Sequence, residues 1–212
     1  MKKILIFLLI LGGCSAVVKP LELARLNSSI DNDGDKVNDY IDIVENARAQ
    51  IGVVTKYDTN YYSSAFPPAD SGACADVIWR ALLESGYDFK KMIDEDIVAN
   101  SEIYPAKGDS NIDFRRVRNI QVFLEKNTES LTTEVIPGDY ENMYQWQGGD
   151  IVTFEQIPGG LWHVAIVSDE RRKDGVPLII HNYGYGVKED DYLLNWPTKI
   201  NGHYRWMLKR DS

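Results

Sequence analysis

The chain has 212 residues, of which 44% are hydrophobic and 11% aromatic, and its formal net charge is −9. A chain of this length and composition can bury a core, which excludes an intrinsically disordered protein. The acidic balance argues against binding to nucleic acid and against electrostatic docking on anionic lipid. We therefore expect one globular domain, whose charge by itself indicates no substrate.

Residues 1–13 have the layout of an export signal. A pair of lysines precedes a short apolar run, which ends in two glycines before Cys14. The run is shorter than the roughly 20 residues that a membrane-spanning helix needs. A cysteine after small residues resembles a bacterial lipobox, in which the thiol is lipidated and becomes the new N-terminus. We expect a lipoprotein outside the cytoplasm, anchored to a bacterial membrane through Cys14 (the outer membrane in a Gram-negative cell), with residues 14–30 as a tether.

Residues 31–42 are typical of an EF-hand calcium loop. The ligand positions of such a loop fall on Asp31, Asp33, Asp35, the main-chain carbonyl of Val37, Asp39 and Asp42. The run resembles the short calcium loops of thrombospondin type 3 and dockerin modules. It departs from them at Lys36, where glycine is expected, and at Asp42, which is shorter than the usual glutamate. We expect a structural Ca²⁺ between the tether and the next helix, with a solvated acidic linker as the alternative.

Hydrophobic periodicity predicts helices in the first part of the remaining chain and strands in the second. The expected helices are residues 39–50, 74–85, 89–99 and 113–126, with a loop over 52–73. The expected strands are residues 150–154, 162–168, 177–183 and 203–208. Helices followed by an antiparallel sheet indicate an α+β domain over residues 39–212.

Cys74 is an unpaired thiol outside the cytoplasm if Cys14 carries a lipid, because the chain has only two cysteines. Exported proteins normally pair or avoid cysteines, so this residue calls for an explanation. It begins a predicted helix, where the macrodipole and free N–H groups lower a thiol pKa. It also shares the apolar stripe of Ile78 and Leu82 and should point inward. We interpret Cys74 as a nucleophile; the alternative is a small buried hydrophobic residue.

Two of the three histidines lie on neighbouring predicted strands. Alternation places His163 on one face of its strand, and a hairpin symmetric about Arg172 sets it opposite His181, within cross-strand reach. We expect the helix that begins at Cys74 to pack on that face. A two-residue turn at Asp174-Gly175 is the alternative, and it shifts the register.

These three side chains suit nucleophilic catalysis at a carbonyl carbon. The Cys74 thiolate attacks, His163 acts as general base and acid, and His181 fixes the His163 ring. Asn182 is the second choice for the orienting group, although alternation sends it to the opposite face. The main-chain N–H of Cys74 is an oxyanion donor by its position. We expect a cysteine peptidase or amidase that needs no cofactor for catalysis.

Several segments carry a resemblance to known enzymes. They are Gly72–Val77, Asp113–Asn119, Gln147–Val152, His163–Asp169 with Ile180–Asn182, and Gly202–Arg205. The order Cys, His, His resembles the NlpC-type branch of the papain-like cell-wall cysteine peptidases. The segments resemble an uncharacterised bacterial family related to that branch and catalogued as a domain of unknown function. The resemblance covers about residues 40–210.

This resemblance implies a papain-like fold, a triad of Cys74, His163 and His181, and hydrolysis of peptidoglycan stem peptides. The superfamily usually has Asp-Cys-Ser/Gly-Gly around the nucleophile, whereas this chain has Ala73-Cys74-Ala75-Asp76. In the related peptidases a tyrosine upstream of the cysteine helps the oxyanion site. The candidates here are Tyr57, Tyr61 and Tyr62, with covering of the core as the alternative role.

The remaining charged candidates are assigned structural roles first. We expect ion pairs for Arg115, Arg116 and Arg118, with binding of a stem-peptide carboxylate as the alternative. His203 is expected in the core or in a cleft wall. The leading interpretation is a lipid-anchored hydrolase of amide bonds. Its alternatives are a non-catalytic envelope lipoprotein that binds peptide or a protein partner in the same groove, and a calcium-dependent adhesion module.

Overall fold

An antiparallel sheet of six strands occupies the centre of the molecule in the computed structural model, which describes residues 19–157, 159–196 and 198–207. In spatial order the strands are β3 (Glu129–Ser130), β8 (Lys199–Arg205), β4 (Ile151–Ile157), β5 (Leu161–Arg171), β6 (Pro177–Asn182) and β7 (Val187–Asp190). A separate parallel pair joins β1 (Lys56–Tyr57) to β2 (Ser71–Gly72). Each of the four predicted strands has its counterpart in β4, β5, β6 or β8.

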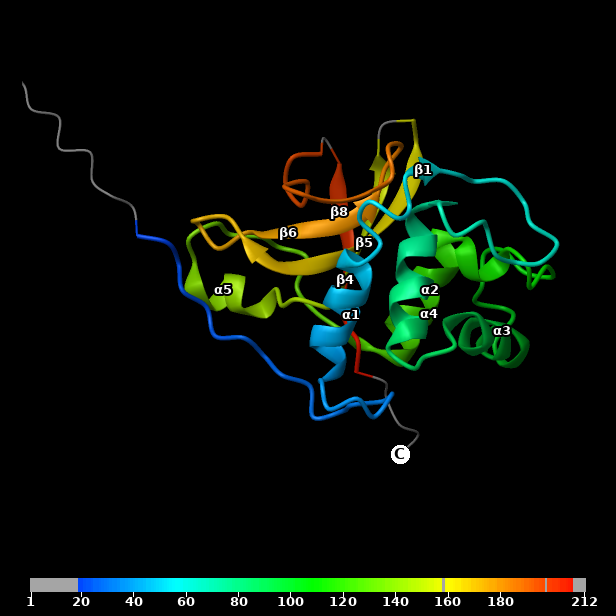
Figure 1. Ribbon diagram of the computed structural model, residues 1–212, viewed down its shortest axis with the longest axis horizontal. Coiled ribbons are helices and arrows are strands. Elements are labelled where there is room, and N and C mark those ends of the chain that lie inside the picture. The colour runs from blue at the N-terminus through cyan, green and yellow to red at the C-terminus, as the bar shows by residue number, and fades with distance from the viewer. Residues whose placement is uncertain (1–18, 158, 197, 208–212) are drawn as a thin grey trace, which may run out of the picture.

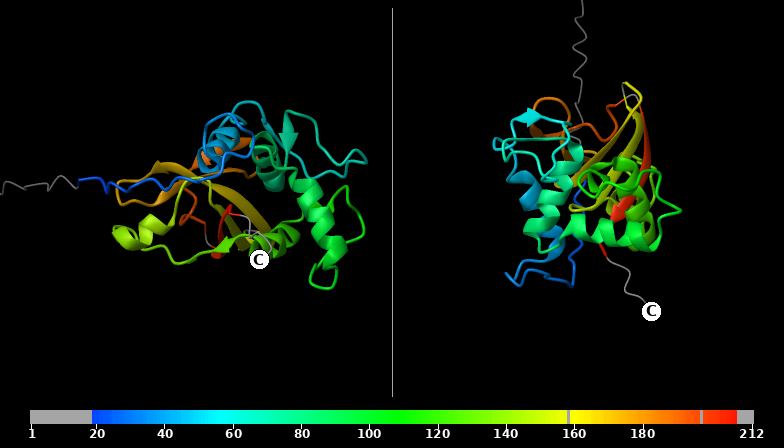
Figure 2. Two further views of the ribbon diagram at one scale, coloured as in Figure 1. Left: turned by 90° about the horizontal axis from the view of Figure 1, so that it is seen from below. Right: turned by 90° about the vertical axis from the view of Figure 1, so that its right-hand side faces the viewer.

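Helices cover both faces of this sheet. They are α1 (Asp39–Arg48), α2 (Cys74–Glu84), α3 (Phe89–Ala99), α4 (Val117–Asn127), α5 (Tyr140–Gln145) and a 3-10 turn η1 (Asp113–Arg115). In Figure 1, α1 and α2 stand beside β5 and β6, with α3 on the far side of α2. Figure 2 shows α1 and α2 on one side of the sheet and α5 on the other. Among the described residues, no helix has the length and apolarity to cross a membrane.

The two faces of the sheet belong to two separate apolar clusters. One face, here called the α2 face, presents Val164 and Ile166 of β5 to the helices. The other, here called the α5 face, presents Ala165 and Val167 of the same strand to a second cluster. All four side chains are completely buried. Strand β5 is therefore apolar on both sides, as a strand between two covering layers must be.

The expected α+β class is confirmed, and three predicted helices begin at the residues where they were placed. The predicted helix over 113–126 is instead interrupted, because Arg116 adopts an extended conformation and caps α4. Asp113 accounts for the interruption, since its carboxylate binds the N–H of Asp109 and the Arg116 guanidinium. The short elements β1, β2, β3, α5 and β7 were not predicted.

The register of the β5–β6 hairpin differs from the symmetric prediction. Val167 pairs with Ile179, and a bulge before Arg171 shifts the remainder of the hairpin. Continued toward the histidines, this register sets His181 beside Ala165 and diagonal to His163. The turn is wider than the alternative two-residue turn, because its closing bond runs from Arg172 N–H to the carbonyl of Val176. Both predicted registers are therefore wrong, but His163 and His181 do lie on the same face of the sheet.

The chain before α1 lies against the domain from residue 19 onward. Leu21 N–H donates to the carbonyl of Lys173 at 2.9 Å, and Leu26 N–H donates to Gln147 Oε1 at 3.0 Å. This segment is the blue strip along the lower left of Figure 1. Within the described part of the expected tether, the chain from Leu21 onward is therefore docked on the domain and not free. The predicted export signal (residues 1–13) and the lipidation site Cys14 lie outside the described residues.

Candidate functional site

Cys74 stands at the start of α2, and Asp76 closes the turn before it. The N-cap residue is Ala73, whose N–H donates to Asp76 Oδ2 at 2.6 Å. The other carboxylate oxygen accepts a hydrogen bond from the Trp79 indole at 2.7 Å. A carboxylate in the first turn of a helix satisfies free N–H groups and complements the macrodipole. Asp76 thus supplies one half of a capping box, the bond to the N-cap N–H, whereas Ala73 has no side-chain oxygen for the other half.

A buried ion pair fixes this turn to the rest of the domain. Arg115 contacts both carboxylate oxygens of Asp76 at 2.8 Å, and the two side chains are 4% and 0% exposed. The same guanidinium donates to the main-chain oxygens of Asn60 at 2.9 Å and Asp58 at 3.3 Å. The bidentate geometry ties the loop before β2 to the turn that carries Cys74. The expected structural ion pair of Arg115 is confirmed.

The Cys74 sulfur is buried in the apolar cluster of the α2 face, with 4% of the residue exposed. Burial raises the thiol pKa to about 11, because an apolar surrounding solvates the thiolate poorly. The N–H groups of Val164, Ala75 and Cys74 itself lower the pKa, but less than burial raises it. The prediction of a lowered thiol pKa is therefore wrong for this structure, because desolvation outweighs the helix N-terminus.

His163 and His181 form a hydrogen-bonded pair on the α5 face. The distance from His163 Nε2 to His181 Nδ1 is 2.9 Å. Burial is the main cause that lowers both pKa values, that of His163 well below its ordinary value and that of His181 to about 4. The pKa of His163 is lowered further by the charge of His181, and that of His181 by the charge of Lys188. Both rings are neutral at pH 7, so one nitrogen of the pair donates and the other accepts.

A small cavity leads from the surface to His181. Its volume is about 140 Å³, and it is lined by His181, Tyr183, Tyr185, Gly186, Lys188, Asp190 and Tyr192. Asp190 Oδ2 lies 3.8 Å from His181 Nε2. Behind His181, the Trp196 ring stands perpendicular to that of His163, with 4.6 Å between the ring centroids. The arrangement provides a carboxylate, an imidazole and a second imidazole in line, which suits holding one ring or moving a proton.

The structure does not bring Cys74 to the histidines. Cys74 packs with Val164 on the α2 face, whereas His163 and His181 project with Ala165 on the α5 face. Among the described residues, no hydrogen bond joins the Cys74 sulfur to either imidazole. The expectation that α2 packs on the histidine face is wrong, because both faces of β5 are apolar and the helix takes the other one. The sulfur nevertheless lies beside the N–H of Val164, the residue after His163.

Asn182, and not His181, is the β6 side chain that lies near the turn carrying Cys74. Its side-chain Nδ2 donates to the carbonyl of Gly72 at 2.7 Å and to that of Lys56 at 3.2 Å. Its Oδ1 is buried and has no hydrogen-bond partner among the described residues. The predicted orientation of Asn182, away from the face of His163, is confirmed. The amide therefore links β6 to β1 and to the turn that carries Cys74.

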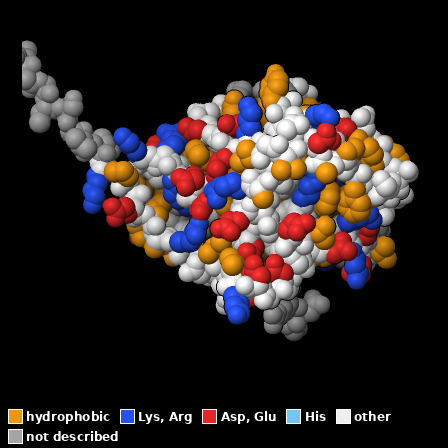
Figure 3. Space-filling model, viewed as in Figure 1, with side chains coloured by type: hydrophobic (Ala, Val, Ile, Leu, Met, Phe, Trp, Pro, Cys, Tyr) orange, Lys and Arg blue, Asp and Glu red, His pale blue; other side chains and the backbone are white. Residues whose placement is uncertain are grey.

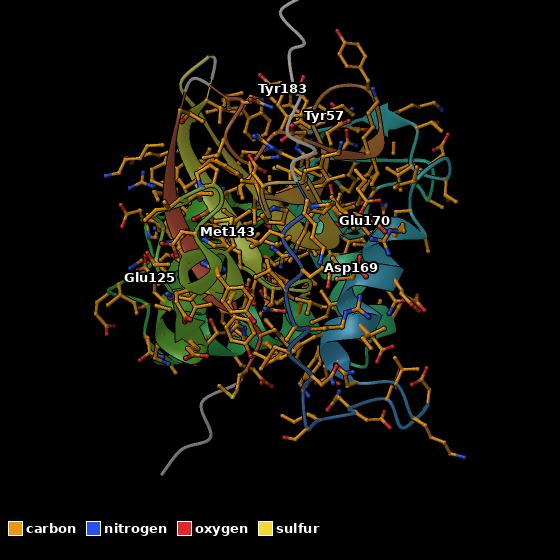
Figure 4. All side chains as sticks on the ribbon, turned by 90° about the vertical axis from the view of Figure 1, so that its left-hand side faces the viewer. Tyr57, Glu125, Met143, Asp169, Glu170 and Tyr183 are labelled. Carbon is orange, nitrogen blue, oxygen red and sulfur yellow. The ribbon has the colours of Figure 1, made fainter. Side chains whose placement is uncertain are left out.

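Of the three tyrosines before Cys74, Tyr57 is the one whose phenol interacts electrostatically with Cys74. Burial raises the pKa of the Tyr57 phenol, and the charge of Cys74 raises it further. Figure 4 shows Tyr57 and Tyr183 at the same end of the molecule. The other two hydroxyls are engaged elsewhere, since Tyr61 donates to Asp109 and Tyr62 to Asp58. Tyr57 is thus the candidate for a role at the oxyanion position.

The predicted calcium loop divides into an exposed and a buried part. Asp31, Asp33 and Asp35 are exposed, and their carboxylate oxygens lie within 4.8 Å of one another. Asp39 is 1% exposed and accepts hydrogen bonds from Asn32 N–H, at 2.9 Å, and from the Tyr87 hydroxyl. Asp42 is 6% exposed, and its pKa is raised to about 6, first by burial. Val37 donates its N–H to Asp35 Oδ1 at 2.7 Å.

His203 belongs to a buried network that the sequence did not reveal. His203 Nε2 lies 2.9 Å from Asp150 Oδ2, and Arg205 binds both oxygens of the same carboxylate at 2.9 and 2.8 Å. The Trp146 ring stacks on the imidazole, with 3.7 Å between the centroids. The expected place of His203 in the core is confirmed. Asp150 precedes an apolar strand directly, which was the available signal for a buried carboxylate.

Asp190 and Trp196 were also missed, and both lie in the segment after β6. Strand β7 reads Val-Lys-Glu-Asp and so lacks the alternation that marks a strand. Its pairing nevertheless sets Lys188 beside His181.

The other two arginines for which ion pairs were predicted are Arg116 and Arg118. Arg116 pairs with Asp113 at 2.6 Å, and Arg118 lies 5.5 Å above the Trp162 ring centroid.

Comparison with known proteins identifies the family. The model of a domain of unknown function, DUF1287, matches residues 44–206, and the chain belongs to this family. The matched region contains Cys74, His163 and His181, whereas the acidic loop precedes it. The chain is also similar to the uncharacterised protein YijF of Escherichia coli (strain K12), with 38% identity over 183 residues, which cover 82% of this chain and 85% of that protein. No solved structure matches the chain.

Proposed function

We propose that the protein is a cysteine hydrolase of the papain-like NlpC type that cleaves amide bonds, with peptidoglycan stem peptides as its substrate class. One observation carries the proposal. The Cys74 sulfur sits at a helix start beside three main-chain N–H groups, one of which belongs to the residue after His163. The hydrogen bond between His163 and His181 supplies the orienting contact that such a base needs. The α+β order of helices before an antiparallel sheet supports the same assignment.

In the proposed reaction the Cys74 thiol gives its proton to His163 and attacks the amide carbonyl carbon. The C–N bond breaks, the amine leaves with the proton from His163, and a thioester remains on Cys74. Water then hydrolyses the thioester, which releases the acid and restores the thiol. The N–H groups near the sulfur are the donors available to the oxyanion. His181 holds the His163 ring in its reactive orientation during these steps.

The free protein holds this site in a closed, neutral state. Because burial raises its pKa to about 11, Cys74 is a thiol and not a thiolate at pH 7. The imidazole of His163 also lies on the far side of β5 from the sulfur. Activity therefore requires a rearrangement on substrate binding that brings His163 to Cys74. We assign substrate entry to the side of Tyr57, because this residue is 38% exposed and its phenol interacts electrostatically with Cys74.

The test is release of muropeptides from purified sacculi, followed by mass spectrometry. We expect release by the wild-type protein, and a loss of at least about 10³-fold in Cys74→Ser and in His163→Gln. Leu83→Ser, at an exposed position of the same helix, is the matched control and should keep full activity. Undiminished release by Cys74→Ser, with melting curves that match the wild type, would exclude the proposed nucleophile.

A second candidate function is non-catalytic binding of a cell-wall peptide or a protein partner. The observation that favours it is the burial of Cys74 together with its raised pKa, since inert structural cysteines have these properties. Iodoacetamide labelling of Cys74 at mildly acidic pH, with and without sacculi, separates the two. The hydrolase predicts fast labelling that depends on sacculi. The binding protein predicts slow labelling in both cases and equal sedimentation of wild type and Cys74→Ser with sacculi.

We also propose that the mature protein is a lipoprotein held outside the cytoplasm through Cys14. The support is the lipobox-like sequence alone. Cells fed a radiolabelled fatty acid should label the wild-type protein and not Cys14→Ala. Equal labelling of both would exclude this anchor.

A further inference from the structure

The loop before α1 has its main chain wrapped around three carboxylates. Lys36 N–H donates to Asp31 Oδ2 at 2.9 Å, Asp35 N–H to Asp33 Oδ1 at 3.1 Å, and Val37 N–H to Asp35 Oδ1 at 2.7 Å. Lys36 has a φ of +79°, so it adopts the left-handed conformation that a glycine holds at this position of an EF-hand loop. The departure from glycine therefore does not change the path of the loop.

Asp42 is the independent observation that points to a cation. It lies in the first turn of α1, is 6% exposed, and its Oδ2 is buried with no hydrogen-bond partner among the described residues. The first turn of α1 follows directly on the loop in which the carboxylate oxygens of Asp31, Asp33 and Asp35 lie within 4.8 Å of one another. A buried carboxylate that faces other carboxylates and no cation is strongly unfavourable. A bound cation supplies the charge that this end of α1 lacks.

We propose that a calcium ion binds here, held by the carboxylates of Asp31, Asp33, Asp35 and Asp42 and by the main-chain oxygen of Val37. Hard oxygen ligands of this number and charge suit Ca²⁺, which accepts an irregular shell more readily than Mg²⁺ does. Asp39 is not a ligand in this assignment, because its carboxylate is buried and both of its oxygens accept hydrogen bonds, from Asn32 N–H and the Tyr87 hydroxyl. Asp31 also accepts hydrogen bonds at both oxygens, from Gly34 N–H and Lys36 N–H, but it is exposed and grouped with Asp33 and Asp35. Figure 3 shows acidic side chains gathered at the lower edge of the molecule, where this loop lies.

The ion would fix the junction between the docked N-terminal segment and the domain. Asp39 N–H donates to the carbonyl of Ile30 at 3.0 Å, and Ser28 N–H donates to Asn38 Oδ1 at 3.2 Å. The side chain of Asn32 donates to the carbonyl of Gly86, just after α2, at 2.8 Å. The loop thus touches the segment before it, the start of α1 and the end of α2. Calcium there would order the chain between the membrane side and the family domain.

Calorimetric titration of the intact, chelator-treated protein with calcium chloride tests the site. We expect one ion per chain, a melting temperature that rises with calcium until the site is saturated, and binding of magnesium chloride at least about tenfold weaker. Asp33→Asn should lower the calcium affinity at least about tenfold. Glu102→Gln, which removes an exposed acidic charge elsewhere, is the control and should bind as the wild type does.

Asp42→Asn separates the metal site from a merely acidic loop. Without calcium this variant should melt at a higher temperature than the wild type, because it removes a buried unpaired charge. With calcium it should melt at a lower temperature than the wild type, because it loses a ligand. Absence of binding heat and of any melting shift at millimolar calcium overturns the proposal, and unchanged affinity in Asp42→Asn overturns it as well. Neither result bears on Cys74.

Discussion

Two polar groups lie on the α5 face of the sheet: His203 with its partners, and the pair of His163 and His181. They differ in how completely their polar atoms are hydrogen-bonded. His203 has an acceptor at each ring nitrogen, since Nδ1 lies 2.8 Å from the Thr132 carbonyl and Nε2 lies 2.9 Å from Asp150. His163 and His181 bond to each other, and a cavity reaches only His181. The first group is closed on every side, and the second is open at one end.

This difference distinguishes a group that stabilises the fold from a group that can still exchange a proton. Both ring nitrogens of His203 are occupied by hydrogen-bond partners, and the Asp150 carboxylate that it contacts is also bound by the Arg205 guanidinium. The neutral pair of His163 and His181 can still gain or pass a proton. Buried polar networks stabilise a fold when every member is satisfied, whereas incompletely paired groups mark places where chemistry is feasible. Three experiments test this comparison.

The largest expected effect comes from breaking the closed group. Asp150→Asn leaves Arg205 and His203 buried beside a neutral amide, and we expect it to lower the free energy of unfolding by about 3–5 kcal/mol. Urea unfolding followed by tryptophan fluorescence measures this. Asp174→Asn, which breaks the half-exposed pair with Arg172, is the control and should change stability by about 0–1 kcal/mol. Equal effects of the two substitutions would remove the distinction between a closed network and a surface pair.

An intermediate effect comes from titrating the open pair. Because the pKa values of His163 and His181 are lowered in the folded protein, the unfolded chain binds more protons below about pH 6.5. Stability should therefore be full above that pH and fall as the pH drops toward about 4, by up to about 3 kcal/mol for His181. Urea unfolding across this range measures the slope. The slope should flatten in His181→Gln, and an unaltered slope in that variant would assign acid sensitivity to other groups.

The smallest effect comes from opening the cavity. Tyr192 lines it, with 5.7 Å between its ring centroid and that of His181. Tyr192→Ala should admit water and raise the pKa of His181 by about one unit or less, with a loss of about 1 kcal/mol in stability. A proton NMR titration of the three histidines measures the pKa. Tyr185→Ala is the control at the same cavity, since Tyr185 is 84% exposed and should leave His181 unchanged.

Local patterns predicted the elements of the candidate site well. The helix over 89–99 was predicted with its observed bounds, and α2 begins at Cys74 as expected. Period-two alternation correctly placed His163 and His181 on one face and Asn182 on the other. The sequence did not reveal the hairpin register, because the bulge between Val167 and Arg171 leaves no mark in a charged loop. Nor did it reveal β7, whose charged residues pair only because β6 offers an edge.

The sequence alone determined which residues share a side of a strand, where α1, α2 and α3 start, and that Cys74 points into the core, because these follow from the periods of the backbone. Only the tertiary structure decided which face of the sheet α2 covers. Strand β5 is apolar on both sides, with Val164 and Ile166 on one and Ala165 and Val167 on the other, so either face offers a helix the same kind of contact. Burial then set the pKa values of Cys74 and the histidine pair, because the removal of water depends on what covers a group and not on the residues beside it in the chain.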